Sequence, residues 1–242
     1  MKKTIVAIAL VSGSLLMPSC GGLQEVVNQM AQQTANTQVG QTQISNGLKE
    51  ALQLGVSKQV TKLTTTNGFY SNELVRIALP DELKQVEKTL RSVGLGNLAD
   101  QGIKALNNTA EVAVKEATPI FVNAITSITI TDATQILMGN NNAATTYLEK
   151  TTSDQLYAKF NPIIKSSFSK VGADVIWTEI INTYNQIPLV KKVNPDLTDY
   201  VTKEAMSGVY TMIAEEEVEI RTNAANRTTV LLKSVFALQD NK

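Results

Sequence analysis

The chain has 242 residues, of which 43% are hydrophobic, and its 22 basic residues balance its 22 acidic ones. This length and composition suit one folded domain with a sizeable core. Because there is no excess of positive charge to neutralise phosphates, we expect no nucleic-acid binding. Aromatic residues make up only 5% of the chain, so Ala, Leu, Ile and Val must supply most of the buried surface, which favours packed helices.

Two residue counts exclude whole classes of chemistry. Histidine is absent and cysteine occurs once, at Cys20. The chain therefore has no Ser-His-Asp triad, no imidazole base and no His-ligated zinc, haem or di-iron centre. A single cysteine allows neither an intramolecular disulfide nor a thiolate metal cluster. We expect no cofactor and no metal, and catalysis would have to depend on carboxylates, Lys, Tyr, Ser, Thr or Arg.

The first residues have the pattern of a bacterial lipoprotein signal. Two lysines precede an apolar run over residues 4–17, fourteen residues long, which is too short to span a membrane. Residues 17–21, with the sequence MPSCG, then resemble a lipobox, in which the Cys sulfur receives diacylglycerol and cleavage makes that Cys the first residue. Ser19 fits the motif, whereas Met17 and Pro18 depart from it. The alternative is an ordinary secretory signal that leaves Cys20 as a free thiol.

This pattern divides the chain into three predicted parts. Residues 1–19 form the signal peptide, 20–43 the lipidated Cys20 and a polar tether rich in Gln, Asn, Thr and Ala, and 44–242 a helical domain. Removing Lys2 and Lys3 with the signal leaves 20 basic against 22 acidic residues, a net charge of −2. Acyl chains, palmitate among them, would anchor the protein through about 0.8 kcal/mol per buried methylene. By analogy with lipoprotein sorting, Gly21 favours the outer membrane, with the domain facing the periplasm.

Apolar residues recur at helical spacing in the predicted domain. Residues 69–79 are ambiguous between a short helix and an extended segment, and Gly94 with Gly96 marks a break between two helices. Pro119 is expected to kink the Ala-rich helix that precedes it. Outside residues 119–172, the predicted helices cover 44–63, 81–93, 98–117, 173–184, 197–221 and the stretch from Thr228 onward.

Residues 119–172 combine three helix patterns, and we expect the other helices to pack around them. Thr129 and Asp132 have capping-box spacing before a short helix, and Gly139 is expected to end it in the left-handed conformation. The three asparagines 140–142 then make a turn.

The rest of this segment predicts two more helices. A second short helix carries Tyr147, and Thr151 with Asp154 has the spacing of another capping box. Pro162 should kink the helix that follows or start a new one.

Short helices joined by polar turns form either a corner with capped ends or a concave site. In the second case the site would be lined by Asp132, Asn141, Tyr147 and Thr151. Farther along, the acidic run at 214–221, AEEEVEIR, is either a solvated face, a cation site or a buried pair of Glu217 and Arg221, which stand four residues apart.

Several stretches together resemble an uncharacterised family of exported bacterial proteins catalogued as a domain of unknown function. The resemblance covers about residues 44–237. It implies a nearly all-helical domain, often lipid-anchored in Gram-negative bacteria, and it transfers no catalytic residue because the family has no established activity. The matching stretches are 47–52, 119–121, 131–133 with 136–139, 143–145, 151–154 with Phe160 and Pro162, 188–192 with 194–197, and 213–217 with Arg221, Arg227 and Thr228.

We therefore predict an all-α fold: a single bundle-like domain of about 8–10 helices, several of them short and located around residues 119–172. The expected function is that of a lipid-anchored envelope protein whose domain binds a partner protein or a small molecule without catalysis. One alternative is an enzyme that uses Asp132, Tyr147, Glu217 and Arg221 as its working groups. The other is a carrier of an apolar ligand such as a lipid, which would need a cavity between helices.

Overall fold

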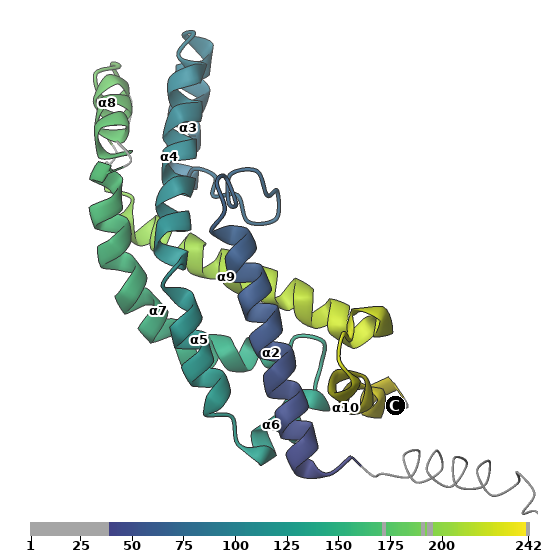
Figure 1. The fold of residues 1–242 in the computed structure, drawn as a ribbon. Coiled ribbons are helices and arrows are strands. Elements are labelled where there is room, and N and C mark those ends of the chain that lie inside the picture. Colours follow the sequence, from purple (N-terminus) through teal and green to yellow (C-terminus); the bar gives the residue numbers. More distant parts are fainter. Residues whose placement is uncertain (1–38, 171–172, 190–191, 193–195, 241–242) are drawn as a thin grey trace, which may run out of the picture. The chain divides into compact units, whose positions relative to one another are not determined.

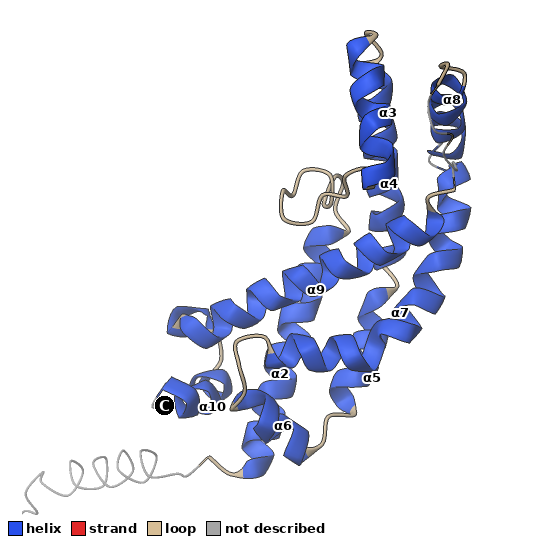
Figure 2. Cartoon of the chain, turned by 180° about the vertical axis from the view of Figure 1, so that it is seen from behind, coloured by secondary structure: helices blue, strands red, loops and turns tan. Residues whose placement is uncertain are grey.

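The computed structural model describes residues 39–170, 173–189, 192 and 196–240, and these ranges contain helices, turns and loops but no strand (Figure 1, Figure 2). The predicted signal peptide, Cys20 and most of the tether lie outside the described residues. A compact unit runs from residue 39 to 242.

The all-α prediction is confirmed. The helices are α2 (Gln41–Leu63), α3 (Asp81–Ser92), α4 (Gly96–Val114), α5 (Ala117–Thr126), α6 (Ile130–Leu137), α7 (Ala143–Lys170), α8 (Ala173–Asn185), α9 (Thr198–Thr222), the 3₁₀ turn η1 (Ala224–Asn226) and α10 (Val230–Asp240).

The long helices α7 and α2 each pack against several other helices. α7 lies against α9, α4, α5, α8 and α6, as expected for the segment that contains it, whereas α2 lies against α6, α9, α5 and α10. Glycines let α2 approach its neighbours closely. A Cβ atom added at Gly47 would lie 2.6 Å from Cγ2 of Val235 in α10, and one added at Gly55 would lie 3.3 Å from Cγ of Glu216 in α9.

The ambiguous residues 69–79 form neither a helix nor a strand. The loop begins at Asn67, whose φ of 61° is in the left-handed region, and Glu111 of α4 accepts a hydrogen bond from the Phe69 N–H at 3.3 Å. Farther along, the buried Asn107 of α4 accepts from the Ile77 N–H at 2.8 Å and donates to the Ile77 carbonyl at 2.9 Å. The Asn107 amide thus satisfies both the N–H and the carbonyl of Ile77, as the backbone of a neighbouring strand would.

Replacing Asn107 with Ala should destabilise the domain by about 1–3 kcal/mol, because the Ile77 N–H and C=O would stay buried without their partners. Urea denaturation followed by far-ultraviolet circular dichroism measures this difference. Asn123→Ala is the matched control, since Asn123 is exposed on α5, and it should change stability by at most about 0.5 kcal/mol. Equal effects of the two substitutions would show that the Asn107 amide does not hold the loop.

The break between α4 and α5 does not lie where the sequence predicts it. α4 ends at Val114 and α5 begins at Ala117, so the predicted kink at Pro119 is wrong. Pro119 is instead in the first turn of α5, where the backbone N–H would have no partner within the helix and a proline is tolerated. The predicted break around Gly94 is confirmed, because Gly94 has a φ of 83°.

The predicted second short helix and the cap at Thr151 are wrong, because α7 is continuous from Ala143 to Lys170 and includes Pro162. The Thr151 hydroxyl donates to the Tyr147 carbonyl at 2.8 Å and that of Thr152 donates to Leu148 at 2.6 Å. A threonine whose hydroxyl donates to a carbonyl of the preceding turn can lie inside a helix without ending it. The spacing of Thr151 and Asp154 therefore does not by itself identify the start of a helix.

The predicted left-handed conformation of Gly139 is also wrong, since the φ of this residue is not positive. Its small size is what the turn between α6 and α7 requires, because a Cβ atom there would lie 2.7 Å from that of Ala143.

Polar side chains bond to the backbone at the start of both C-terminal helices. The Thr198 N–H at the start of α9 donates to Asp196 at 3.0 Å. The last helix begins at Val230 instead of the predicted Thr228, and the Thr229 hydroxyl accepts from the Leu232 N–H at 3.1 Å. Taken one at a time, the helices of the described ranges are not both long and apolar enough to cross a membrane; α5 and α6 pass that test only as a pair, bent by 105°.

Candidate functional site

The acidic run of α9 contains a buried ion pair. The side chains of Glu217 and Arg221 are 5% and 2% exposed, and Arg221 Nη2 lies 2.8 Å from Glu217 Oε1. Of the sequence alternatives, the buried pair is therefore the one that the structure shows, and only Glu215 and Glu219 form a solvated acidic face. Glu216 is buried as well, and it accepts from Gln59 at 2.6 Å and pairs with Lys58 at 2.8 Å, both on α2.

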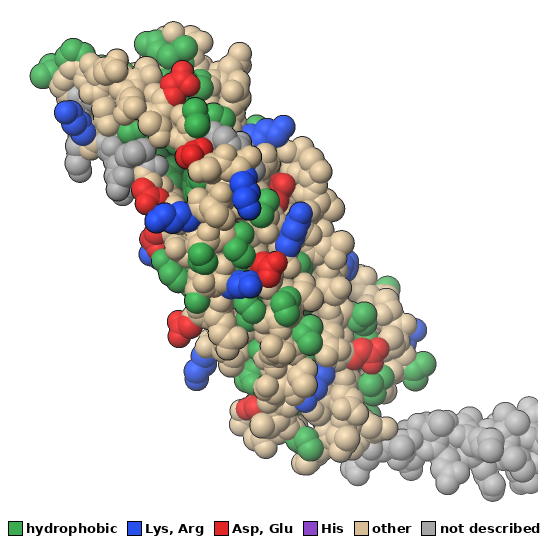
Figure 3. Space-filling model, turned by 60° about the vertical axis from the view of Figure 1, so that its left-hand side comes forward, with side chains coloured by type: hydrophobic (Ala, Val, Ile, Leu, Met, Phe, Trp, Pro, Cys, Tyr) green, Lys and Arg blue, Asp and Glu red, His purple; other side chains and the backbone are tan. Residues whose placement is uncertain are grey.

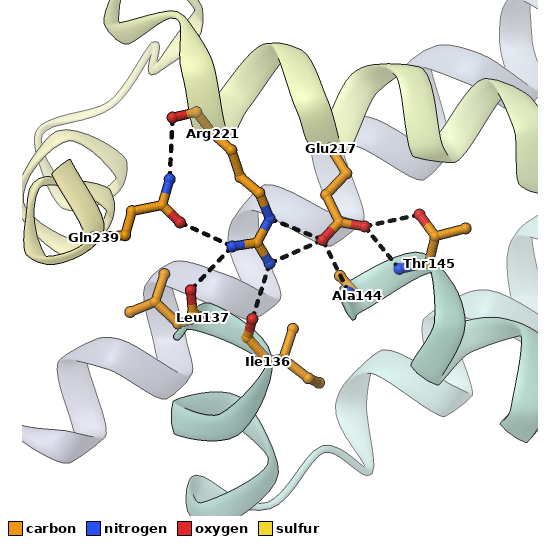
Figure 4. A network of polar contacts seen from close by, with 7 residues as sticks. All are labelled: Ile136, Leu137, Ala144, Thr145, Glu217, Arg221 and Gln239. Carbon is orange, nitrogen blue, oxygen red and sulfur yellow. Dashed lines mark hydrogen bonds and ion pairs between the residues drawn. The ribbon is translucent and has the colours of Figure 1, made fainter. Parts of the chain in front are cut away.

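Arg221 uses every N–H of its guanidinium group. Nε donates to Glu217 at 2.9 Å, Nη1 donates to the Leu137 carbonyl at 2.9 Å and to Gln239 at 2.8 Å, and Nη2 donates to the Ile136 carbonyl at 2.8 Å (Figure 4). The two carbonyls belong to the last turn of α6, where backbone acceptors have no partner within the helix. A cation at this end also complements the helix dipole.

Glu217 accepts hydrogen bonds from the backbone at the start of α7, as Arg221 donates them to the backbone at the end of α6. Its Oε1 atom accepts from the Ala144 N–H at 2.9 Å, and its Oε2 atom accepts from the N–H and the hydroxyl of Thr145, both at 2.8 Å. These N–H groups belong to the first turn of α7, which attracts an anion. The Glu217–Arg221 network, defined as this pair with Ile136, Leu137, Ala144, Thr145 and Gln239, thus joins α6, α7, α9 and α10 (Figure 4).

This network leaves little room for a ligand. A cavity of about 20 Å³ lies beside it, bounded by Leu52, Gly55, Ile213 and the two charged residues among others. That space suits about one water molecule. Because the donors of Arg221 and both oxygens of Glu217 are engaged, the arrangement fits a structural connection better than an acid, a base or a binding site for an acyl chain.

The other four candidate residues lie outside the network of Figure 4. Asp132 is half-buried and completes the predicted capping box, accepting from the Thr129 N–H at 3.1 Å and its hydroxyl at 2.7 Å, which lowers the pKa of Asp132. Burial, with the charge of Asp132, raises the pKa of Tyr147. Asn141 is exposed in the turn before α7, and Thr151 is exposed on that helix. Of these four residues, the structure brings Tyr147 within the influence of the Asp132 charge, and Thr151 donates to the Tyr147 carbonyl.

An open hollow, lined by polar and apolar side chains, lies along the contact between α7 and α9. It has a volume of about 380 Å³, and we call it the α7–α9 hollow. Sequence reasoning missed it, although hydroxyl or acidic residues at i, i+4 and i+8 of a helix were the available signal. Its lining residues are Thr145, Glu149 and Ser153 of α7 and Lys203, Met206, Ser207, Tyr210, Thr211 and Ala214 of α9.

The base of the hollow contains the phenol of Tyr210. This residue is 7% exposed, and its hydroxyl lies 2.8 Å from that of Thr152 and 3.4 Å from that of Ser153. Burial raises the pKa of Tyr210, and the charge of Glu149 adds to the shift. The group therefore stays protonated at neutral pH. Because the Thr152 hydroxyl donates to the Leu148 carbonyl, the Tyr210 O–H donates to Thr152, and the phenol oxygen can still accept a hydrogen bond.

Charge is distributed evenly on the face of the domain shown in Figure 3. Basic, acidic and hydrophobic side chains alternate there, and neither charge forms a continuous patch. On this face the protein offers no surface on which a highly charged partner would be attracted from a distance.

The described part is thus an all-α domain of short and long helices. The buried pair of Glu217 and Arg221 connects four of these helices, and a hollow opens along the contact between α7 and α9. The chain belongs to the family described as "Protein of unknown function (DUF4197)", whose sequence pattern matches residues 38–237. This confirms the resemblance to a family without established activity. Neither the curated proteins nor the solved structures include a match to the chain.

Proposed function

We propose that the protein is a lipid-anchored component of the bacterial envelope whose helical domain binds a ligand without transforming it. The observation that carries the binding role is the α7–α9 hollow, an open space of about 380 Å³ whose lining combines several polar side chains with apolar surface. Ligand sites are concave and combine a few placed polar groups with apolar surface. The anchor rests on the lipobox-like sequence at Cys20.

The distribution of charged groups argues against the enzyme alternative. A general acid or base must reach the substrate within hydrogen-bond distance, directly or through one water molecule. Glu217 and Arg221 are buried and fully bonded, and Asp132 caps α6. The lipid-carrier alternative lacks support from the cavity beside this pair, whose volume of about 20 Å³ cannot take an acyl chain.

The proposed location follows from the anchor. Acyl chains on Cys20 would hold the protein on the outer membrane with its domain in the periplasm. The tether would run from Cys20 to residue 40, because α2 begins at Gln41. Since no cofactor or nucleic acid is required, the proposed partners are the membrane and a protein or small-molecule ligand.

The anchor is tested by expressing the full chain in a Gram-negative host with labelled palmitate. We expect label and membrane association for the wild type and neither for Cys20→Ser. Mass spectrometry of the purified protein should show the acyl mass on Cys20. An unmodified Cys20 thiol, or equal membrane association of the two proteins, would refute the anchor.

The binding role is tested by identifying molecules that co-purify with the wild-type chain but not with Ser207→Trp, whose side chain fills the hollow. We expect such a ligand to be recovered unchanged after incubation. Chemical conversion of the ligand would favour an enzyme instead.

A further inference from the structure

We propose that the α7–α9 hollow binds a neutral polyhydroxylated ligand of the glycan class. This inference rests on the proposed binding function and names the ligand chemistry of the same site. Three features support it: the dimensions of the hollow, its dense set of hydroxyl groups and the rigid support beneath them.

The dimensions follow from how the two helices run. Thr145 bonds to Glu217, Thr152 to Tyr210 and Asn161 to Thr202, so rising numbers in α7 meet falling numbers in α9 and the helices are antiparallel. At 1.5 Å per residue, the lining extends about 12 Å along α7 and about 16 Å along α9. An elongated ligand of several small units fits this form better than a compact one.

Small side chains create the hollow. Where larger residues would close the contact between the helices, the lining has Thr145, Ser153, Ser207, Thr211 and Ala214. Longer side chains lie between them, with Glu149 on α7 and Lys203 on α9. Lys203 is paired with Asp199 at 2.8 Å, so the Glu149 carboxylate is the charge that is left to face the hollow, and it disfavours an anionic ligand.

Hydroxyl groups dominate the polar lining. Ser, Thr and Tyr hydroxyls each donate one hydrogen bond and accept others, so they can match a ligand whose own groups are hydroxyls. The hydroxyls of Ser207 and Thr211 can both donate to a ligand and accept from it, whereas those of Ser153 and Tyr210 donate within the protein and offer their oxygens as acceptors. Met206 and Ala214 add apolar surface for the C–H groups of a sugar ring.

The same lining is poorly suited to a peptide. Peptides bind by adding a strand to a sheet edge, by placing apolar anchors in a groove, or by stacking prolines on aromatic rings. The hollow is formed by two helices, whose backbone groups bond internally, and its lining has no Leu, Ile, Val, Phe or Trp. The only aromatic residue, Tyr210, has a buried ring and presents its hydroxyl.

The base of the hollow is held in place before any ligand arrives. The Thr145 hydroxyl is fixed by Glu217, and the Tyr210 ring packs edge-on against Phe121 with 5.9 Å between ring centroids. The Ser153 hydroxyl donates to the Glu149 carbonyl of its own helix. Groups that are already ordered lose less conformational entropy on binding, which favours recognition of a weakly binding sugar.

The test uses the full chain in detergent, an array of neutral oligosaccharides, and solution titrations with chitotriose, maltotriose and cellotriose followed by nuclear magnetic resonance. We expect saturable binding of at least one neutral oligosaccharide. Ser207→Trp should weaken it by at least about tenfold, a difference of about 1.4 kcal/mol. Thr211→Val, which removes a hydroxyl at nearly constant volume, should weaken it less. Ser234→Trp, on the exposed face of α10, is the matched control and should leave affinity within about twofold.

Two results would overturn the proposal: no saturable binding to any neutral oligosaccharide, or equal losses in Ser207→Trp and Ser234→Trp. If sugars fail but a peptide or another molecule co-purifies in a Ser207-dependent way, the binding function stands and the glycan class is wrong. If no Ser207-dependent ligand is found at all, the binding function and the glycan proposal both fail.

Discussion

Replacing Arg221 with Met is expected to lower the free energy of unfolding by about 3–5 kcal/mol, the typical cost of leaving one partner of a buried ion pair alone. Arg221 is 4% exposed, and its removal leaves the buried Glu217 carboxylate without its cation and takes a donor from each of two carbonyls at the end of α6. Methionine keeps most of the side-chain volume, so the loss reports the charge and the hydrogen bonds instead of an empty space.

Guanidinium chloride denaturation monitored by circular dichroism gives the magnitude. Arg91→Met is the matched control, because Arg91 also bonds to two carboxylates, Glu87 and Asp100, but its side chain is 43% exposed. Exposed pairs contribute at most about 1 kcal/mol. The double variant Glu217→Gln/Arg221→Met should be more stable than Arg221→Met, since no uncompensated charge remains. If Arg221→Met costs no more than Arg91→Met, the network does not stabilise the domain.

Trp177→Ala is expected to cost about 3–5 kcal/mol, the usual range for removing a large aromatic side chain from a core. Trp177 of α8 is 1% exposed, and its Nε1–H donates to the Gly102 carbonyl of α4 at 3.1 Å. The two residues fit closely, because a Cβ atom added at Gly102 would lie 3.1 Å from Cζ2 of the indole. The substitution therefore removes a buried ring and a hydrogen bond that join α8 to α4.

Thermal and denaturant unfolding followed at 222 nm measure this loss without depending on tryptophan fluorescence. Val175→Ala, on the same helix at 67% exposure, is the control and should change stability by at most about 0.5 kcal/mol. A small effect of Trp177→Ala would indicate that α8 is not an integral part of the core.

The Arg221→Met variant is also expected to affect ligand binding at the α7–α9 hollow. Thr145 belongs both to the Glu217–Arg221 network and to the lining of the α7–α9 hollow. Arg221→Met should therefore weaken ligand binding by loosening the start of α7, whereas Trp177→Ala acts at α8, which contributes no residue to the lining.

The sequence by itself determined those features that depend on neighbouring residues. Helical spacing of apolar side chains identified an all-α domain, and Thr129 with Asp132 located the start of α6. Gly94 marked a turn because glycine adopts its backbone conformation without strain. These signals are local: periodicity, caps and turns act within a few residues and need no knowledge of what packs against them.

Only the tertiary structure decided which polar residues are structural and where a site can form. The spacing of Glu217 and Arg221 allowed three interpretations, and only their burial in the structure identified the right one. Spacing within α9 could not decide, because the backbone partners of Glu217 lie 72 and 73 residues away and those of Arg221 up to 85. The α7–α9 hollow likewise needs two helices that are distant in sequence to meet through small side chains. The physical reason is that burial and hydrogen-bond saturation belong to the packed arrangement of helices, which sequence spacing within one helix does not specify.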